Sequence, residues 1–115
     1  KLLMYHGYSD PGITPYGSVR FYEELAHDHG GIAKTAEQVR LFMVPGMFHC
    51  TGGPGPNSFD TLTALESWVE RGVAPESIVA AHYAGNDPQQ KRERTMPLCP
   101  WPTAAPGLPR LTPQG

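Results

Sequence analysis

The chain has 115 residues, with 9 Lys and Arg against 11 Asp and Glu and a formal net charge of −2. This length suits one small domain, and the charge argues against a nucleic-acid-binding module, which carries a basic excess on one face. No apolar run approaches the ~18 residues that a membrane span requires. The 13 Gly and 13 Pro, about twice the ordinary share, predict either a loop-rich domain or an ordinary core with a disordered end.

The first expected elements are a strand and a helix. Residues 1–7 (KLLMYHG) form a near-continuous apolar run closed by a glycine, as in a parallel strand covered on both faces. The Asp-Pro-Gly triplet at 10–12 indicates a turn. Thr14, followed by proline, indicates an N-cap with Pro at the first helical position. Apolar residues at helical spacing predict a helix over about 15–29, followed by a polar connection at 32–39.

A second strand and helix follow in the same order. Residues 40–46 (RLFMVPG) form the second apolar run, and residues 47–57 form a loop rich in Gly and Pro. A helix is predicted over about 58–71, capped by Asn57 or Ser58 and ended by a glycine. Its apolar stripe comprises Phe59, Leu62, Leu65, Trp68 and Val69.

Residues 78–81 (IVAA) predict a third short strand or extended segment. Strands that alternate with helices indicate an α/β fold with a parallel sheet. From Thr95 onward the chain has six prolines in 21 residues, which predicts a tail without regular structure. We therefore expect a folded α/β segment over 1–94 and a disordered Pro-rich tail over 95–115. Two or three strands make a sheet too small to cover its own core, so part of a larger layered structure is expected.

Two polar residues follow the two predicted strands at the same offset. Asp10 comes three residues after Gly7, and His49 comes three residues after Gly46. Ligands of parallel α/β sheets bind beyond the carboxyl ends of the strands, so an acid and an imidazole should meet there. A carboxylate that accepts the Nδ1–H of a histidine fixes its tautomer, as a catalytic triad requires. In α/β-hydrolases the order is nucleophile, acid, histidine, which places a nucleophile upstream of Lys1.

Simpler interpretations exist for each residue. An Asp before Pro-Gly is typical of a plain turn, and a histidine in a glycine-rich loop is often structural or solvent-exposed. Cys50 adjoins His49 in sequence, so their side chains diverge and make a poor thiolate–imidazole pair. No serine lies in a G-x-S-x-G elbow between a strand and a helix; the serines are Ser9, Ser18, Ser58, Ser67 and Ser77.

Other candidate sites are weaker. The two histidines of His27-Asp28-His29 point to different faces of a helix, which argues against a metal site. The GGPGP stretch at 52–56 lacks the lysine and spacing of a phosphate loop, so a backbone turn is favoured. Cys50 and Cys99 belong to no CxxC pair. They could pair with each other, stay free, or pair with partners outside the chain.

Three stretches together resemble the tannase and feruloyl esterase family. They are KLLMYHGYSDPGITP at the start, RLFMVPGMFHCTGGPGPNSFDTLTALESWVERGVAPESIVA in the middle, and RTMPLCPWP near the end. The resemblance covers about residues 1–102, and the H-C-x-G-G-P-G-P stretch at 49–56 is its most specific part. It implies the C-terminal part of an α/β-hydrolase parallel sheet, within a secreted or periplasmic protein several times longer than this chain.

The resemblance also implies roles for particular residues. Asp10 matches the acid of a Ser-His-Asp triad, and His49 matches the base. Cys50 matches one half of a disulfide beneath the triad, with its partner outside this chain. Cys99 matches a second family cysteine whose partner is not visible. The serine and a lid domain with a calcium site would precede Lys1, so no cofactor or metal is expected in this chain.

The sequence departs from the family pattern in two places. Phe48 stands where the family usually has Gly before the histidine, and a bulky side chain there is expected to crowd the loop. From Pro102 to Gly115 the usual family ending, with its last cysteine, is not visible.

The resemblance predicts a serine carboxylesterase acting on small aromatic esters of gallate or hydroxycinnamate type, with no nucleic-acid or membrane partner. The alternative is a truncated, non-catalytic remnant or a binding module. Alone, the 115-residue chain should lack the nucleophile and be inactive. It should also fold poorly, because so small a chain buries only about 60–65% of its unfolded surface.

Overall fold

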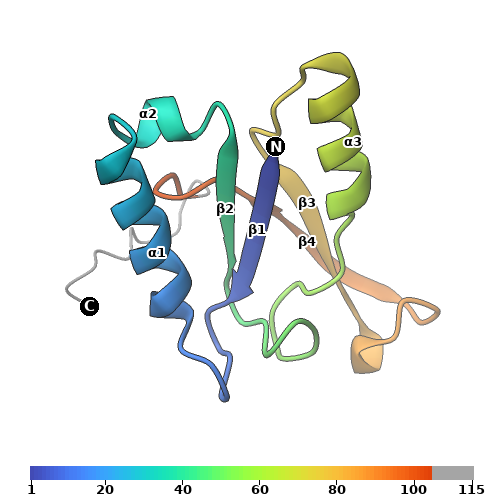
Figure 1. The fold of residues 1–115 in the computed structure, drawn as a ribbon. Helices are drawn as coiled ribbons and strands as arrows, with labels where there is room; N and C mark the ends of the chain where they lie inside the picture. The colour runs from blue at the N-terminus through green and yellow to red at the C-terminus, as the bar shows by residue number, and fades with distance from the viewer. Residues whose placement is uncertain (105–115) are drawn as a thin grey trace.

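Strands β1 (Leu2–Gly7) and β2 (Val39–Val44) form a parallel pair near the middle of the molecule. A computed structural model describes residues 1–104 of the chain (Figure 1). The two strands are joined through helices α1 (Pro15–Asp28) and α2 (Ile32–Thr35). Because β1 and β2 run in the same direction, the loops that follow them lie at the same end of the pair, at the bottom of Figure 1.

Strand β2 is buried on both faces. Leu41 and Met43 pack with α1, while Phe42 and Val44 pack in a second cluster with residues of the β3–β4 sheet. The prediction of a strand covered on both faces is therefore confirmed for β2. It is wrong for much of β1, where Leu2 and other side chains reach solvent.

Helix α1 starts and ends close to the predicted positions. Pro15 is its first residue, and Thr14 is at the N-cap position, although its side chain makes no capping hydrogen bond. Tyr22 is fully buried, and its hydroxyl donates to the Val39 carbonyl oxygen over 2.9 Å. This bond ties the helix to the first residue of β2. The short helix α2 lies within the predicted polar connection at 32–39.

Helix α3 (Thr61–Arg71) begins later than predicted. Its N-cap is Asp60, whose side chain accepts from the Thr63 amide over 2.9 Å, so the predicted caps Asn57 and Ser58 are wrong. The physical reason is that Ser58 forms an antiparallel bridge with Ala81, which keeps this segment extended. Gly72 ends the helix in the left-handed conformation, as predicted.

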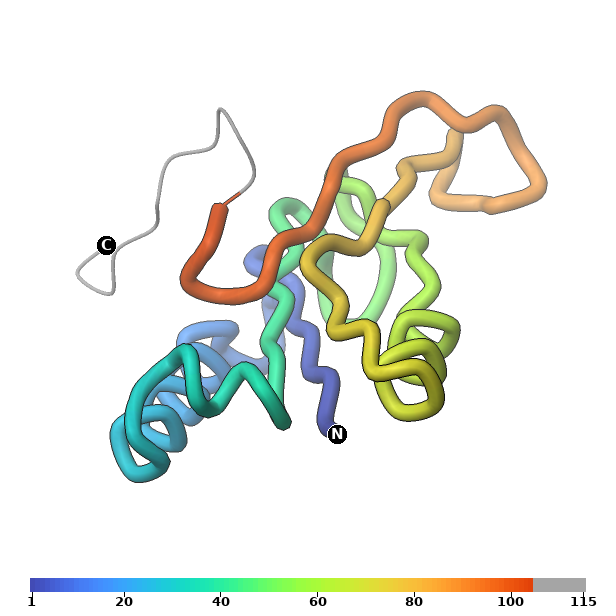
Figure 2. Tube along the Cα trace, turned by 90° about the horizontal axis from the view of Figure 1, so that it is seen from above, coloured from blue at the N-terminus to red at the C-terminus, as the bar shows by residue number. Residues whose placement is uncertain are grey.

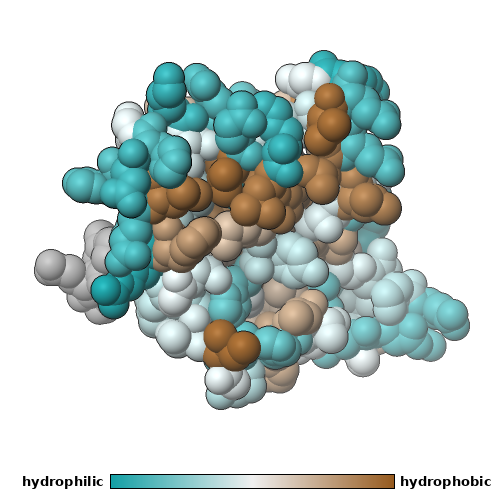
Figure 3. Space-filling model, in the orientation of Figure 1, coloured by the Kyte–Doolittle hydropathy of each residue, from teal (hydrophilic) through white to brown (hydrophobic). Residues whose placement is uncertain are grey.

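The predicted apolar stripe of α3 is only partly buried. Trp68 lies in the interior, whereas Leu62 and Val69 are 65% and 61% exposed. Seen from above, α1 and α3 lie on opposite sides of the β1–β2 pair (Figure 2). A band of apolar surface runs across the face between the two helices (Figure 3).

The third predicted strand exists but does not join the parallel sheet. Strand β3 (Ile78–Tyr83) pairs antiparallel with β4 (Arg92–Leu98) in a separate two-stranded sheet. A short connection that includes the single-turn helix η1 (Ala84–Asn86) joins them, and only antiparallel strands can be joined so briefly. The expected parallel sheet of two or three strands is therefore corrected to a parallel pair and a separate antiparallel pair.

Strand β4 also corrects the prediction for the tail. The chain was expected to lose regular structure at Thr95, yet the strand continues to Leu98, so the expected boundary between 94 and 95 falls inside it. Its one proline, Pro97, is tolerated because β4 pairs along its length with β3 alone. After the strand, residues 99–104 of the predicted tail are described, and Pro100 forms a bridge with Phe42. Residues 105–115 lie outside the described residues. Within residues 1–104, no helix has the length and apolar character needed to cross a membrane.

Candidate active site

The loops after β1 and β2 are held together by backbone hydrogen bonds. The Tyr8 amide donates to the Val44 carbonyl oxygen over 2.9 Å, and the Ser9 amide donates to the Met47 carbonyl oxygen over 3.0 Å. These bonds carry the parallel pairing beyond the ends of the strands. They bring the loop with Asp10 against the loop with His49.

The glycine-rich segment at 52–56 folds back on the start of its own loop. The Gly55 amide donates to the Gly46 carbonyl oxygen over 3.0 Å. A β-carbon on Gly53 would lie only 2.2 Å from that same carbonyl oxygen, and Gly53 has a φ of +92°. The segment is thus a tight backbone turn, as favoured from the sequence, and its glycines allow the close approach that shapes the histidine loop.

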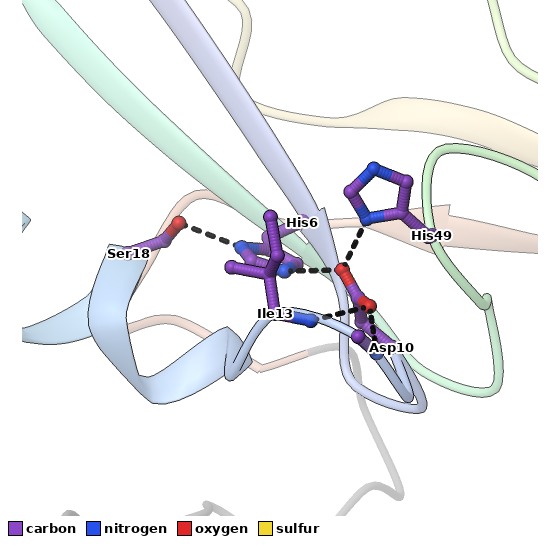
Figure 4. Close-up of polar contacts among 6 residues, drawn as sticks. His6, Asp10, Ile13, Ser18 and His49 are labelled. Atoms are coloured by element: carbon purple, nitrogen blue, oxygen red, sulfur yellow. Dashed lines mark hydrogen bonds and ion pairs between the residues drawn. The ribbon is translucent and has the colours of Figure 1, made fainter.

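The Asp10 carboxylate is bonded on both oxygens (Figure 4). Its Oδ1 accepts from the amides of Gly12 and Ile13, at 2.9 and 3.0 Å. Its Oδ2 accepts from His49 Nδ1 at 2.8 Å and from His6 Nε2 at 2.9 Å. The side chain is only 1% exposed, so protein donors replace water around it.

These donors favour the charged form of the carboxyl group. The amide of Ile13 contributes most to holding the pKa of Asp10 far below its ordinary value. Burial opposes this effect, while bonds from His49, Gly12 and His6 lower the pKa further. Asp10 is therefore a carboxylate throughout the neutral and mildly acidic range, and it acts only as an acceptor.

The acceptor role of Asp10 settles the tautomer of His49. Because the carboxylate cannot donate, His49 Nδ1 must carry the hydrogen that lies between them. In the neutral ring, Nε2 then has a free lone pair. Among residues 1–104 it makes no hydrogen bond, and the side chain is 56% exposed. Its ring therefore offers a proton-accepting nitrogen at the surface, with a carboxylate fixed behind it.

A hollow of about 180 Å³ adjoins this pair. It is lined by residues from the end of β1 and from both loops: Tyr5, His6, Gly7, Asp10, Met47, His49 and Cys50. The two residues predicted to meet at the sheet edge thus share one concavity.

The other residues singled out from the sequence are the two cysteines and Phe48. Cys50 is exposed in the histidine loop with a φ of +63°, and its thiol is free, as is that of Cys99. Phe48 is 44% exposed and turns toward Gly52. The expected crowding by Phe48 therefore does not stop His49 from reaching Asp10.

Sequence reasoning missed two residues, His6 and Ser18. His6 Nδ1 lies 2.7 Å from the Ser18 hydroxyl, and its Nε2 contacts Asp10. The sequence signal for His6 was a histidine near the end of an otherwise apolar run. Nothing in the sequence pairs it with Ser18, which comes twelve residues later on α1.

No group of three or more His, Cys, Asp or Glu side chains within residues 1–104 is arranged to hold a metal ion. The calcium site implied by the family resemblance was expected outside this chain, so this result does not bear on it.

In the parallel strand–helix–strand unit the acid precedes the histidine along the chain, which is the order that these two residue types have in α/β-hydrolases. The model of the family described as "Tannase and feruloyl esterase" matches residues 1–106. The chain belongs to this family.

Known proteins agree with this assignment. An uncharacterized esterase of Xanthomonas campestris pv. campestris is 40% identical, over 91% of this chain and 23% of its own length. The mono(2-hydroxyethyl) terephthalate hydrolase of Piscinibacter sakaiensis is 45% identical, over 91% of this chain and 17% of its own. The crystal structure of an esterase from Aspergillus oryzae superposes with a TM-score of 0.81 at 31% identity, over 89% of this chain and 23% of the other. The chain spans about a fifth of the length of these relatives.

Proposed function

We propose that this chain supplies the acid and the base of a Ser-His-Asp triad in a carboxylic ester hydrolase. The observation that carries the proposal is the 2.8 Å contact between His49 Nδ1 and Asp10 Oδ2, which leaves His49 Nε2 open beside a hollow. The nucleophile is a serine outside the 115 residues, in the complete protein that contains this chain.

In this mechanism His49 Nε2 takes the proton of the serine hydroxyl as the serine oxygen attacks the ester carbonyl. Asp10 stabilises the imidazolium that forms and keeps its Nδ1–H directed inward. The imidazolium then protonates the leaving alkoxide, and an acyl-serine remains. A water molecule then gives a proton to the same Nε2 as its oxygen attacks the acyl carbon. The bond from that carbon to the serine oxygen breaks, the imidazolium returns the proton to the serine oxygen, and the carboxylic acid leaves.

The substrates we propose are small esters of aromatic acids, of gallate or hydroxycinnamate type. The names of the family and of the Piscinibacter relative support this class, since each refers to an ester of an aromatic acid. We also propose that Cys50 forms a disulfide with a cysteine next to the nucleophile. Such a bond persists in an oxidising compartment, so the complete protein is assigned to the periplasm or the extracellular space.

The test is the substitution His49→Ala in the complete protein, assayed on methyl gallate and methyl ferulate. Loss of the general base should lower kcat by roughly 1,000-fold or more. Asp10→Asn should also lower kcat strongly, because the amide favours the wrong tautomer of His49. The matched control is His27→Ala, since His27 is 89% exposed on α1.

The control variant should retain wild-type turnover. Hydrolysis at the wild-type rate by His49→Ala would refute the proposed role of this chain. A wild-type protein with no turnover on any aromatic ester would instead favour the alternative, a non-catalytic remnant or binding module.

A further inference from the structure

His6 lies at the end of β1 with both ring nitrogens hydrogen-bonded. Nδ1 is 2.7 Å from the Ser18 hydroxyl, and Nε2 is 2.9 Å from Asp10 Oδ2 (Figure 4). The side chain is only 14% exposed. The ring therefore joins helix α1 to the carboxylate of the acid–histidine pair, and the mechanism above assigns it no role.

The direction of these bonds follows from the carboxylate. Asp10 only accepts, so His6 Nε2 carries a hydrogen and donates it to Oδ2. In the neutral ring Nδ1 is then an acceptor, and the Ser18 hydroxyl donates to it. The result is a directed series of hydrogen bonds from Ser18 through His6 to Asp10, meeting the bond from His49 at the same oxygen.

The shared oxygen makes the orientation of Asp10 depend on His6. The amides of Gly12 and Ile13 hold only Oδ1. Without the bond from His6, only these two amides would hold the carboxylate in place. It could then rotate about Oδ1 and move Oδ2 away from His49. The donor on His6 opposes this rotation because it comes from a partly buried ring that is itself held by Ser18.

We propose that His6 is a positioning residue of the esterase: it holds Asp10 Oδ2 where that atom accepts the Nδ1–H of His49. The inference rests on the proposed function and deepens it. His6 acts through Asp10, because its two ring nitrogens are engaged by Ser18 and Asp10 and are not available to exchange a proton with the substrate. Its effect is on the rate of the chemical step, because a misplacement of about 1 Å in catalytic geometry can cost on the order of 100-fold in rate.

The test compares His6→Leu with His6→Gln in the complete protein. Leucine fills the space without a donor, whereas the glutamine amide can replace the Nε2–H that points at Asp10. His6→Leu should lower kcat by roughly 10- to 100-fold with KM changed less than about twofold. His6→Gln should recover most of the lost turnover. Rescue by a donor separates positioning from a general loss of packing.

Ser18→Ala is the second variant, and it keeps the test valid if His6→Leu does not fold. It leaves the donor to Asp10 in place and removes the group that holds the His6 ring. It should lower kcat by several-fold, less than His6→Leu, again with KM nearly unchanged.

Wild-type turnover in His6→Leu, or in Ser18→Ala should His6→Leu not fold, would overturn the proposal. Equal impairment of His6→Leu and His6→Gln would also overturn it, because the donor would then not matter. His49→Ala distinguishes a failure of the proposed function from a failure of the proposed role of His6. If His49→Ala is active, the proposed function fails; if it is inactive while His6→Leu is wild-type, only the role of His6 fails.

Discussion

The carbonyl oxygen of Met47 occupies the place that a side chain on Gly7 would need. A β-carbon on Gly7 would lie 2.3 Å from this oxygen and 2.4 Å from the carbonyl oxygen of Phe48, far inside van der Waals contact. The last residue of β1 must therefore be glycine for the histidine loop to pack against the acid loop.

Gly7→Ala should push the two loops apart and separate His49 from Asp10. We expect kcat/KM of the complete protein to fall by at least about tenfold, and stability to fall by about 1–3 kcal/mol, as for overpacking. Kinetics and urea unfolding measure the two effects. Gly17→Ala is the control, because a β-carbon there meets only ordinary contacts; equal behaviour of the two variants would contradict the role of the close approach.

The depressed pKa of Asp10 predicts a pH-dependent contribution to stability. A carboxyl group whose folded pKa lies below its ordinary 3.8 stabilises the folded state fully above that value. This contribution is lost as the pH falls through the folded pKa. The difference in unfolding free energy between the wild type and Asp10→Asn should therefore shrink as the pH falls below about 4. Urea unfolding at pH 3 to 7 measures it, and a difference that grows toward acid would contradict the prediction.

Removal of the buried Tyr22 hydroxyl should have a modest effect on stability. Tyr22→Phe removes its bond to the Val39 carbonyl oxygen and should lower the unfolding free energy by about 0.5–1.5 kcal/mol. Tyr16→Phe is the matched control, since Tyr16 is 54% exposed and should change stability by less than about 0.5 kcal/mol. Urea unfolding compares them, and equal effects would argue against the bond.

The cysteines predict different reactivity in the chain and in the complete protein. In the 115-residue chain, Ellman's reagent should find two thiols after denaturation, since both cysteines are free. In the complete protein, Cys50 should react only after reduction, with loss of turnover. An active, unreduced protein with a reactive Cys50 would contradict the proposed disulfide.

The acid–histidine pair could be predicted because its signal is local. Asp10 and His49 each follow an apolar strand that ends in glycine, at the same offset, and parallel strands bring such positions to one edge. The β3–β4 hairpin was not predictable in this way. Strand Ile78–Tyr83 joins an antiparallel pair because Arg92–Leu98 is available to pair with it. The high proline content of the chain from Thr95 onward predicted no strand there.

By itself the sequence determined the β1–α1–β2 order, the turn at Asp10 and the family to which the chain belongs, because these depend on spacing along a few neighbouring residues. Only the tertiary structure decided which donors surround Asp10 Oδ2. His6 and Ser18 lie on a strand and a helix, and their contact depends on how α1 packs against β1. The spacing of apolar residues does not predict this contact, because a hydrogen bond between two elements depends on how the elements lie relative to each other in space.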